Sequence, residues 1–140
     1  MRYLAIDFGE KRTGLAVGDD VMKIATPVGT VQTSKPAERL RQIAKAIEQH
    51  SPDELVVGLP LNMDGTEGDA ARNTRVLARQ LTERFGLAVH LVDERLSTHA
   101  ADAQMSERDL TRKAKKVRRD ALAAATILGD FLRSRWCAPC

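Results

Sequence analysis

The sequence predicts an α/β fold in which helices cover the faces of a mixed β-sheet. The chain begins with three short apolar runs joined by short turns, which favours an antiparallel meander. It continues with apolar runs that alternate with stretches of helical period, which favours parallel strands joined by helices. No linker or internal repeat divides the 140 residues, so we expect a single domain, 1–140, with a substantial core.

The first three strands are expected close to the N-terminus. Apolar runs cover residues 3–6 and 13–17, and the charged turn between them is bracketed by two glycines, which give a tight turn its backbone freedom. The third run, 24–31, contains Pro27 and Gly29. These two residues are typical of an edge strand or of a bulge, so we expect this run at one side of the sheet.

Two amphipathic helices follow. Over residues 35–50, apolar side chains recur three and four positions apart, as on one face of a helix. Ser34 is a suitable N-cap for this helix, and Pro36 suits its first turn. A second helix is expected over 69–85, with Gly86 as its C-terminal cap.

Two further strands and two helices complete the pattern. Short apolar runs over 54–58 and 88–92 predict strands on either side of the second helix. A short helix is expected over 100–105 and the last helix over 117–132. The final residues, about 134–140, are predicted to form a flexible tail.

Composition and charge limit the class of protein. With 43% hydrophobic and 29% charged residues, the composition is that of a globular protein, and no apolar run is long enough to span a bilayer. The N-terminus lacks a signal-peptide pattern, so we expect a cytoplasmic protein with no membrane partner. Cys137 and Cys140 fall in the last four residues, which does not indicate a disulfide framework.

Three carboxylates occupy unusual positions. Asp7 ends an apolar strand, and Glu94 comes just after another. Asp120 shares its helical face with Ala124 and Ile127, so it points with the buried stripe of the last helix. An acid facing a core is costly unless something pairs with it. We therefore expect these three acids to converge at one end of the sheet.

Converging carboxylates repel one another unless a cation lies between them. Mg²⁺ or Mn²⁺ fits, because both prefer hard oxygen ligands, and such ions promote phosphodiester hydrolysis. Structural explanations remain for each acid. Asp7 could bond the following turn, Glu94 could be a solvated strand end, and Asp120 could stabilise its helix terminus.

Basic residues gather just before the last helix. The mildly basic chain, with a net charge of +3, concentrates its basic excess in 108–119. This segment overlaps a polar stretch, 106–116, that we expect to be a mobile loop. The residues expected to contact nucleic-acid phosphates are Lys11, Arg12, Asn62, Arg95, Arg112, Lys113, Lys115, Lys116, Arg118 and Arg119. Solvated charges, a structural ion pair at Arg95 and turn chemistry at Asn62 are the alternatives.

Four stretches of the chain, DFGEKRTGLAVGD, VVGLPLNMDGT, VDERLST and RRDALAAATIL, resemble the YqgF family, also called RuvX, in order and over nearly the whole length. The resemblance implies an RNase H-like fold with five strands in the order 3-2-1-4-5 and helices on both faces. It also implies a cytoplasmic, divalent-metal-dependent nuclease of pre-16S rRNA 5′-end maturation. Asp7, Glu94 and Asp120 match the acids of the family's motifs.

The resemblance leaves several functions open. Related resolvases carry an acid at the end of the fourth strand, whereas this sequence has none near Gly58. The alternatives are a resolvase of branched DNA, which would act as a dimer rather than a monomer, and a non-catalytic nucleic-acid-binding factor of ribosome assembly. Actin-like ATPases share the Asp7-Phe8-Gly9 turn, but they need two such domains around the nucleotide.

Overall fold

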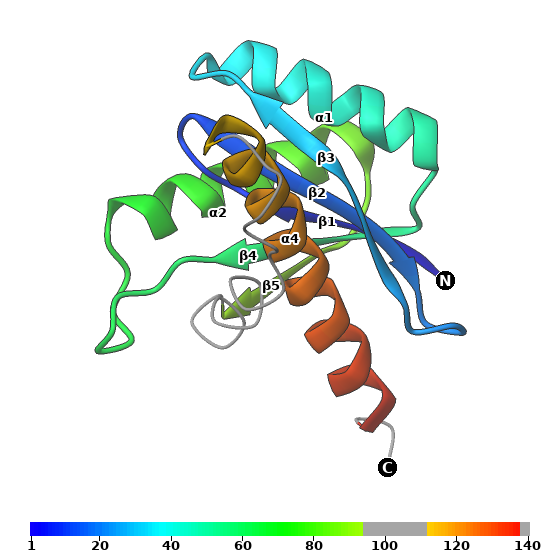
Figure 1. Ribbon diagram of the computed structural model, residues 1–140. Helices are drawn as coiled ribbons and strands as arrows, with labels where there is room; N and C mark the ends of the chain where they lie inside the picture. Colours follow the sequence, from blue (N-terminus) through cyan, green and yellow to red (C-terminus); the bar gives the residue numbers. More distant parts are fainter. Residues whose placement is uncertain (94–111, 138–140) are drawn as a thin grey trace.

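The computed structural model describes residues 1–93 and 112–137, and in this part of the chain five strands form one sheet in the order β3-β2-β1-β4-β5 (Figure 1). The strands are β1 (Arg2–Asp7), β2 (Arg12–Asp19), β3 (Ala25–Gln32), β4 (Glu54–Leu59) and β5 (Val89–Asp93). The helices are α1 (Pro36–His50), α2 (Asp69–Phe85) and α4 (Arg112–Cys137). The predicted fold class and strand order are confirmed.

The directions of the strands bring the ends of several strands together. β1 pairs with β2, and β2 with β3, antiparallel, whereas β1, β4 and β5 are parallel. The ends of β1, β4 and β5, at Asp7, Leu59 and Asp93, therefore lie at the same end of the sheet, which we call the carboxyl end. Because β2 runs the other way, its first residues, Arg12 to Gly14, also lie there.

Alternating side chains build a core on each face of the sheet. In β1, Leu4 and Ile6 belong to a cluster with residues of α1 and α2, whereas Tyr3 and Ala5 belong to a cluster with residues of α4. All four side chains are fully buried. Figure 1 shows α1 and α2 on one face and α4 on the other, so an acid that ends β1 lies between two covered faces.

α4 runs along β2 in the same direction. A Cβ on Gly14 would lie 1.9 Å from the carbonyl oxygen of Asp120, and a Cβ on Gly18 would lie 3.1 Å from Cδ2 of Leu128. The two spacings agree, because four strand residues and eight helical residues both cover about 12–13 Å. The N-terminal part of α4 therefore lies at the carboxyl end of the sheet.

α4 is longer than predicted at both ends. It begins at Arg112 rather than 117, so part of the expected loop, 106–116, is helical, and it continues to Cys137 through the start of the expected tail. The basic residues before Val117 carry no apolar period, although lysine, arginine and alanine are good helix formers. Of the helices in the described ranges, none is long and apolar enough to cross a membrane.

The other boundaries need smaller corrections. Lys35 rather than Ser34 precedes α1 as its N-cap, and it makes no side-chain cap bond. The hydroxyl of Thr33 accepts a hydrogen bond from the Lys35 N–H, so Ser34 lies before the cap. The third strand, β3, lies at the edge of the sheet, as one of the two expectations for it had it, and its register with β2 shifts beside Leu15. The short helix expected over 100–105 lies outside the described residues.

Candidate active site

The structure presents Asp7 at the end of a fully buried strand. The residues before it, Tyr3 to Ile6, are inaccessible to solvent, and Asp7 is half-buried. Strand alternation places Asp7 on the same face as Tyr3 and Ala5, which is the face that α4 covers. The buried strand fixes the backbone of Asp7, so its carboxylate is held at the carboxyl end of the sheet.

Gly14 brings Asp120 to this place. Asp7 and Gly14 are directly paired in the antiparallel β1–β2 ladder. The missing side chain of Gly14 lets the backbone of Asp120 pack against β2, because any Cβ there would meet the Asp120 carbonyl oxygen at 1.9 Å. The structure therefore brings together two of the three predicted acids, from β1 and α4, although more than a hundred residues separate them in the sequence.

Arg12 makes an ion pair with Asp120. Its Nε donates a hydrogen bond to Asp120 Oδ2 at 2.9 Å, and the two side chains are 40% and 21% exposed. Arg12 and Gly14 are two residues apart in β2, so both face α4. The residue expected to contact phosphate thus lies beside a candidate metal ligand. The neighbouring Lys11 is exposed at the turn, where its carbonyl accepts a hydrogen bond from Thr33 N–H at 3.0 Å.

The end of β5 reaches the same end of the sheet. Ile6 is paired with Val57 in β4, and Leu59 is paired with Asp93 in β5. The position beside Asp7 in β4 is therefore Gly58, which confirms from the register that no acid stands there. Glu94 and Arg95 lie outside the described residues. Among the residues whose side chains the structure describes, no group of three potential metal ligands is found.

The N-terminal part of α4 extends past Asp120. Because α4 runs along β2, residues 112–119 continue beyond the carboxyl end of the sheet. The basic residues of this segment are Arg112, Lys113, Lys115, Lys116, Arg118 and Arg119. Their helical backbone leads from the end of α4 at Arg112 to Asp120, and contact of these six residues with nucleic acid stays a prediction.

The family model described as "RuvX: Holliday junction resolvase" matches residues 1–134 of this chain. The chain belongs to the RuvX family. This finding confirms the resemblance that the four sequence motifs predicted.

Sequence relatives of this RuvX-family chain cover nearly all of it. A protein of Anaeromyxobacter sp. (strain Fw109-5) named "Putative pre-16S rRNA nuclease" is 42% identical over 135 residues, covering 96% of this chain and 98% of the relative. A protein of Neisseria gonorrhoeae with the same name is 41% identical over 129 residues, covering 92% of this chain and 85% of the relative.

Solved structures show the fold. Thermus thermophilus RuvC in complex with a Holliday junction substrate superposes with a TM-score of 0.58 at 16% identity, covering 97% of this chain and 96% of that one. A fowlpox virus resolvase in complex with Holliday junction DNA gives 0.55 at 10% identity, covering 96% and 99%. At such identities the likeness shows an RNase H-like fold alone.

Arg39 supports the β1–β2 turn that follows Asp7, and sequence reasoning missed it. Its Nη2 donates to the carbonyl oxygens of Glu10 at 2.5 Å and Thr33 at 3.4 Å, and its guanidinium lies 4.8 Å from the centre of the Phe8 ring. The residue is 6% exposed, and burial lowers its pKa. The sequence feature that could have identified it is the position of an arginine on the same helical face as the apolar Ile43.

Asn62 lies in a loop that is held by hydrogen bonds between its own residues. Asn62 N–H donates to the Thr66 carbonyl at 2.9 Å, and its side-chain amide donates to the Thr66 hydroxyl at 3.0 Å. Asp64 accepts from Thr66 N–H at 3.0 Å, and Gly65 has a φ of 87°. These bonds are the turn chemistry considered from the sequence. The loop projects from the end of β4 (Figure 1), and contact of Asn62 with substrate stays a prediction.

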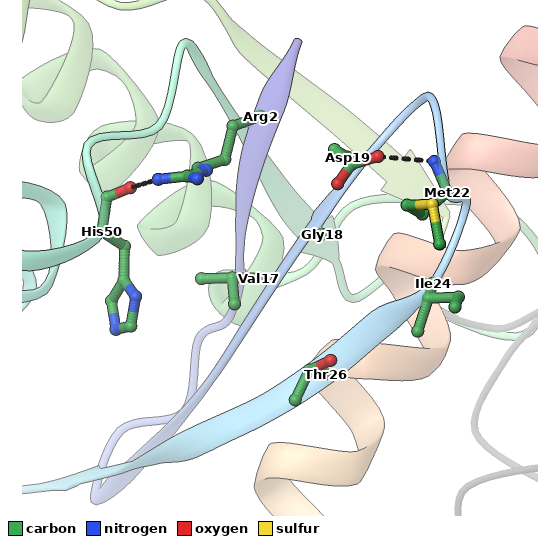
Figure 2. A pocket seen from close by; sticks show the side chains of 8 residues that line it. All are labelled: Arg2, Val17, Gly18, Asp19, Met22, Ile24, Thr26 and His50. Carbon is green, nitrogen blue, oxygen red and sulfur yellow. Dashed lines mark hydrogen bonds between the residues drawn. The ribbon is translucent and has the colours of Figure 1, made fainter.

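A pocket of about 410 Å³ lies elsewhere in the fold. Figure 2 shows its lining residues, which include Arg2, Asp19, Met22 and His50. Arg2 begins β1 and Asp19 ends β2, so the pocket lies at the opposite end of the sheet from Asp7. The hollow is therefore separate from the paired acids of this RuvX-family chain.

Proposed function

We propose that this chain is a divalent-metal-dependent nuclease that acts in 5′-end maturation of pre-16S rRNA, with Asp7, Glu94 and Asp120 as its metal ligands. The observation that supports it most is the contact of the Asp120 backbone with Gly14, the direct pairing partner of Asp7. The names of the sequence relatives support the same substrate. Ribosome biogenesis in the cytoplasm and a role of Mg²⁺ belong to this proposal.

The donor set fits such a cation. Asp7 and Asp120 offer carboxylate oxygens, which Mg²⁺ and Mn²⁺ prefer. Asp120 already pairs with the guanidinium of Arg12, so its carboxylate lies beside a positive charge. Glu94 directly follows Asp93, the last residue of β5 at the carboxyl end, so it would complete the set. A cation bound there would stabilise charge on the phosphate and favour deprotonation of the attacking water.

The chain's own residues position the substrate in this proposal. The buried β1 strand holds the backbone of Asp7, and the glycine contact holds the backbone of Asp120, so neither backbone has to be ordered when substrate binds. The basic N-terminal part of α4 would bind phosphates on both sides of the cleaved bond, since its backbone extends past the acids. The positive end of the helix dipole would add to this attraction.

Branched DNA is the second candidate substrate. The family model is described by Holliday junction resolution, and the RuvC structure contains such a junction. A resolvase that cuts two strands symmetrically would act as a dimer. Cleavage of a four-way junction and of a pre-16S rRNA fragment, measured side by side with the molar mass in solution, would separate the two substrates.

A non-catalytic binding factor is the third candidate, supported by the missing acid at Gly58. Asp120→Asn separates it from a nuclease, with Asp130→Asn on the same helix as the matched control. Loss of a residue that only supports a metal ligand costs about 10–100-fold in activity. Loss of a ligand itself should cost at least as much, so we expect Asp120→Asn to reduce cleavage of the rRNA fragment by about 100-fold or more. Asp130 pairs with Arg133 within its own helix, so Asp130→Asn should cleave normally. Metal-independent binding with no turnover by the wild type would contradict the nuclease.

A further inference from the structure

We propose that Arg12 occupies the Asp120 carboxylate only in the metal-free protein, and that the incoming divalent cation displaces it toward the substrate phosphate. This inference rests on the proposed metal site and adds a residue that regulates it. The starting observation is the 2.9 Å contact between Arg12 Nε and Asp120 Oδ2, which joins residues 108 positions apart.

The contact uses an atom that the metal site needs. Asp120 lies on the face of the sheet that also carries Asp7, Arg12 and Gly14. A guanidinium and a divalent cation at one carboxylate repel each other, because both are positive and only a few ångströms apart. The two partners of Asp120 therefore compete, and the doubly charged ion with further carboxylate ligands has the advantage.

Arg12 can leave at little cost. Its side chain is 40% exposed, so solvent already covers much of the guanidinium, and an ion pair of this exposure contributes little to stability. Arg12 begins β2 directly after the turn of the β1–β2 hairpin. Arg39 and the Thr33–Lys11 backbone bond hold that turn in place, so a change in the Arg12 rotamer needs no movement of the backbone.

The released guanidinium would bind a phosphate of the substrate. It would remain beside the metal site with all of its donors available, and arginine binds phosphate oxygens with a bidentate fork. Metal binding and substrate binding are then coupled, because the cation frees the arginine that contacts the phosphate. In the alternative, Arg12 stays on Asp120 throughout and orients it as a fixed support.

The sign of a change in metal affinity separates these two roles. Mn²⁺ binding is measured by calorimetry for the wild type, Arg12→Gln, Arg12→Lys and Arg133→Gln. The last variant removes an arginine–aspartate pair from α4 away from the site. If Arg12 competes with the cation, Arg12→Gln should bind Mn²⁺ about twofold to fivefold more tightly, the range expected for loss of a half-exposed pair. Arg12→Lys should remain close to the wild type, and Arg133→Gln should not change.

A second readout follows Arg12 itself. In the ¹H–¹⁵N spectrum, the Nε–H signal of Arg12 should move from a hydrogen-bonded to a solvent-exposed position when Mg²⁺ is added. At saturating Mn²⁺, Arg12→Gln should raise KM for the rRNA fragment more than it lowers kcat. Weaker Mn²⁺ binding by Arg12→Gln, or an Nε–H signal unchanged by Mg²⁺, would overturn the competition. No metal binding by the wild type would overturn the proposed metal site, and the inference with it.

Discussion

The two ends of the sheet each carry an aspartate at a strand terminus, but the partners of these acids differ. At the end of β2, Asp19 accepts a hydrogen bond from the backbone N–H of Val21 at 2.9 Å and another from that of Met22 at 2.6 Å, the second of which Figure 2 shows. At the other end of the sheet, Asp7 pairs in the ladder with Gly14, over which the backbone of Asp120 packs. One acid stabilises a local turn, whereas the other lies where distant segments of the chain meet.

The same contrast distinguishes the pocket from the candidate active site. In the pocket, Arg2 donates to the carbonyl oxygen of His50 at 2.9 Å, so its charged groups bond mainly to the backbone. At the carboxyl end, Arg12 and Asp120 bond side chain to side chain across 108 residues. The two regions therefore differ in kind: two charged side chains pair directly at the carboxyl end, where we propose the active site, whereas Arg2 in the pocket bonds to a backbone carbonyl.

The largest expected effect tests the two strand-end aspartates against each other. We expect Asp7→Asn to lose about 100-fold or more of the cleavage rate, since it would remove a proposed metal ligand, while both the fold and RNA binding stay close to those of the wild type. Asp19→Asn keeps an oxygen that can accept the two turn bonds, so its cleavage should be normal. Rates on the rRNA fragment, with proteins freed of contaminating nuclease, provide the measurement. Equal cleavage rates for Asp7→Asn and Asp19→Asn would show that the two aspartates do not differ in function.

Gly14→Ala tests the close contact at the site, with Gly29→Ala as its control. The new methyl group would overlap the backbone of α4, and we expect a loss of about 3 kcal/mol in the free energy of unfolding together with reduced cleavage. A Cβ on Gly29 meets nothing within 4 Å, so its change should stay within about 0.5 kcal/mol. Urea denaturation measures both. A Gly14→Ala protein as stable as Gly29→Ala would show that α4 does not press on β2.

Arg39→Ala tests the support of the β1–β2 turn that follows Asp7. It removes hydrogen bonds to the carbonyls of Glu10 and Thr33 and the contact with Phe8, and we expect it to cost about 2 kcal/mol of stability. Arg41→Ala, on the same helix but with a largely exposed side chain, should cost less than about 0.5 kcal/mol. Denaturation of the two variants under identical conditions provides the measurement, and equal losses would argue against a supporting role.

The smallest effect concerns an acid with local partners only. Hydrogen bonds from Arg41 and Gln42 lower the pKa of the half-buried Glu38 from 4.5 to about 2. A lowered pKa adds stability above the unfolded value, and this contribution is lost as the pH falls from about 4.5 toward 2. Compared with Glu38→Gln, the wild type should lose slightly more stability across that window. Urea midpoints that fall equally with pH in the two proteins would contradict this.

Sequence reasoning predicted the elements that carry a clear period. The apolar spacing in α1 and α2 gave their bounds within a residue, and Gly86 ends α2 in the left-handed conformation, as expected. Asp120 was selected as a candidate because the residues that share its helical face, such as Ala124 and Leu128, are apolar, and both are buried. The start of α4 was missed, because its basic residues carry no apolar period.

The contacts between elements could not be predicted in the same way. The periods of β2 and α4 do not show which residue of one lies over which residue of the other, so the Gly14–Asp120 contact needed the structure. The Arg12–Asp120 pair depends on that same register. Arg39 was hidden, since a helical pattern does not show which carbonyl groups a buried arginine will meet. The part of Glu94 in the site stays a prediction.

Anomalous diffraction from crystals grown with Mn²⁺ tests the central claim most directly. The account predicts a strong anomalous peak between the carboxylates of Asp7 and Asp120, with Glu94 as a further ligand and Arg12 turned away from Asp120. Crystals at saturating Mn²⁺ with no peak between these carboxylates, and with the Arg12–Asp120 pair intact, would contradict it.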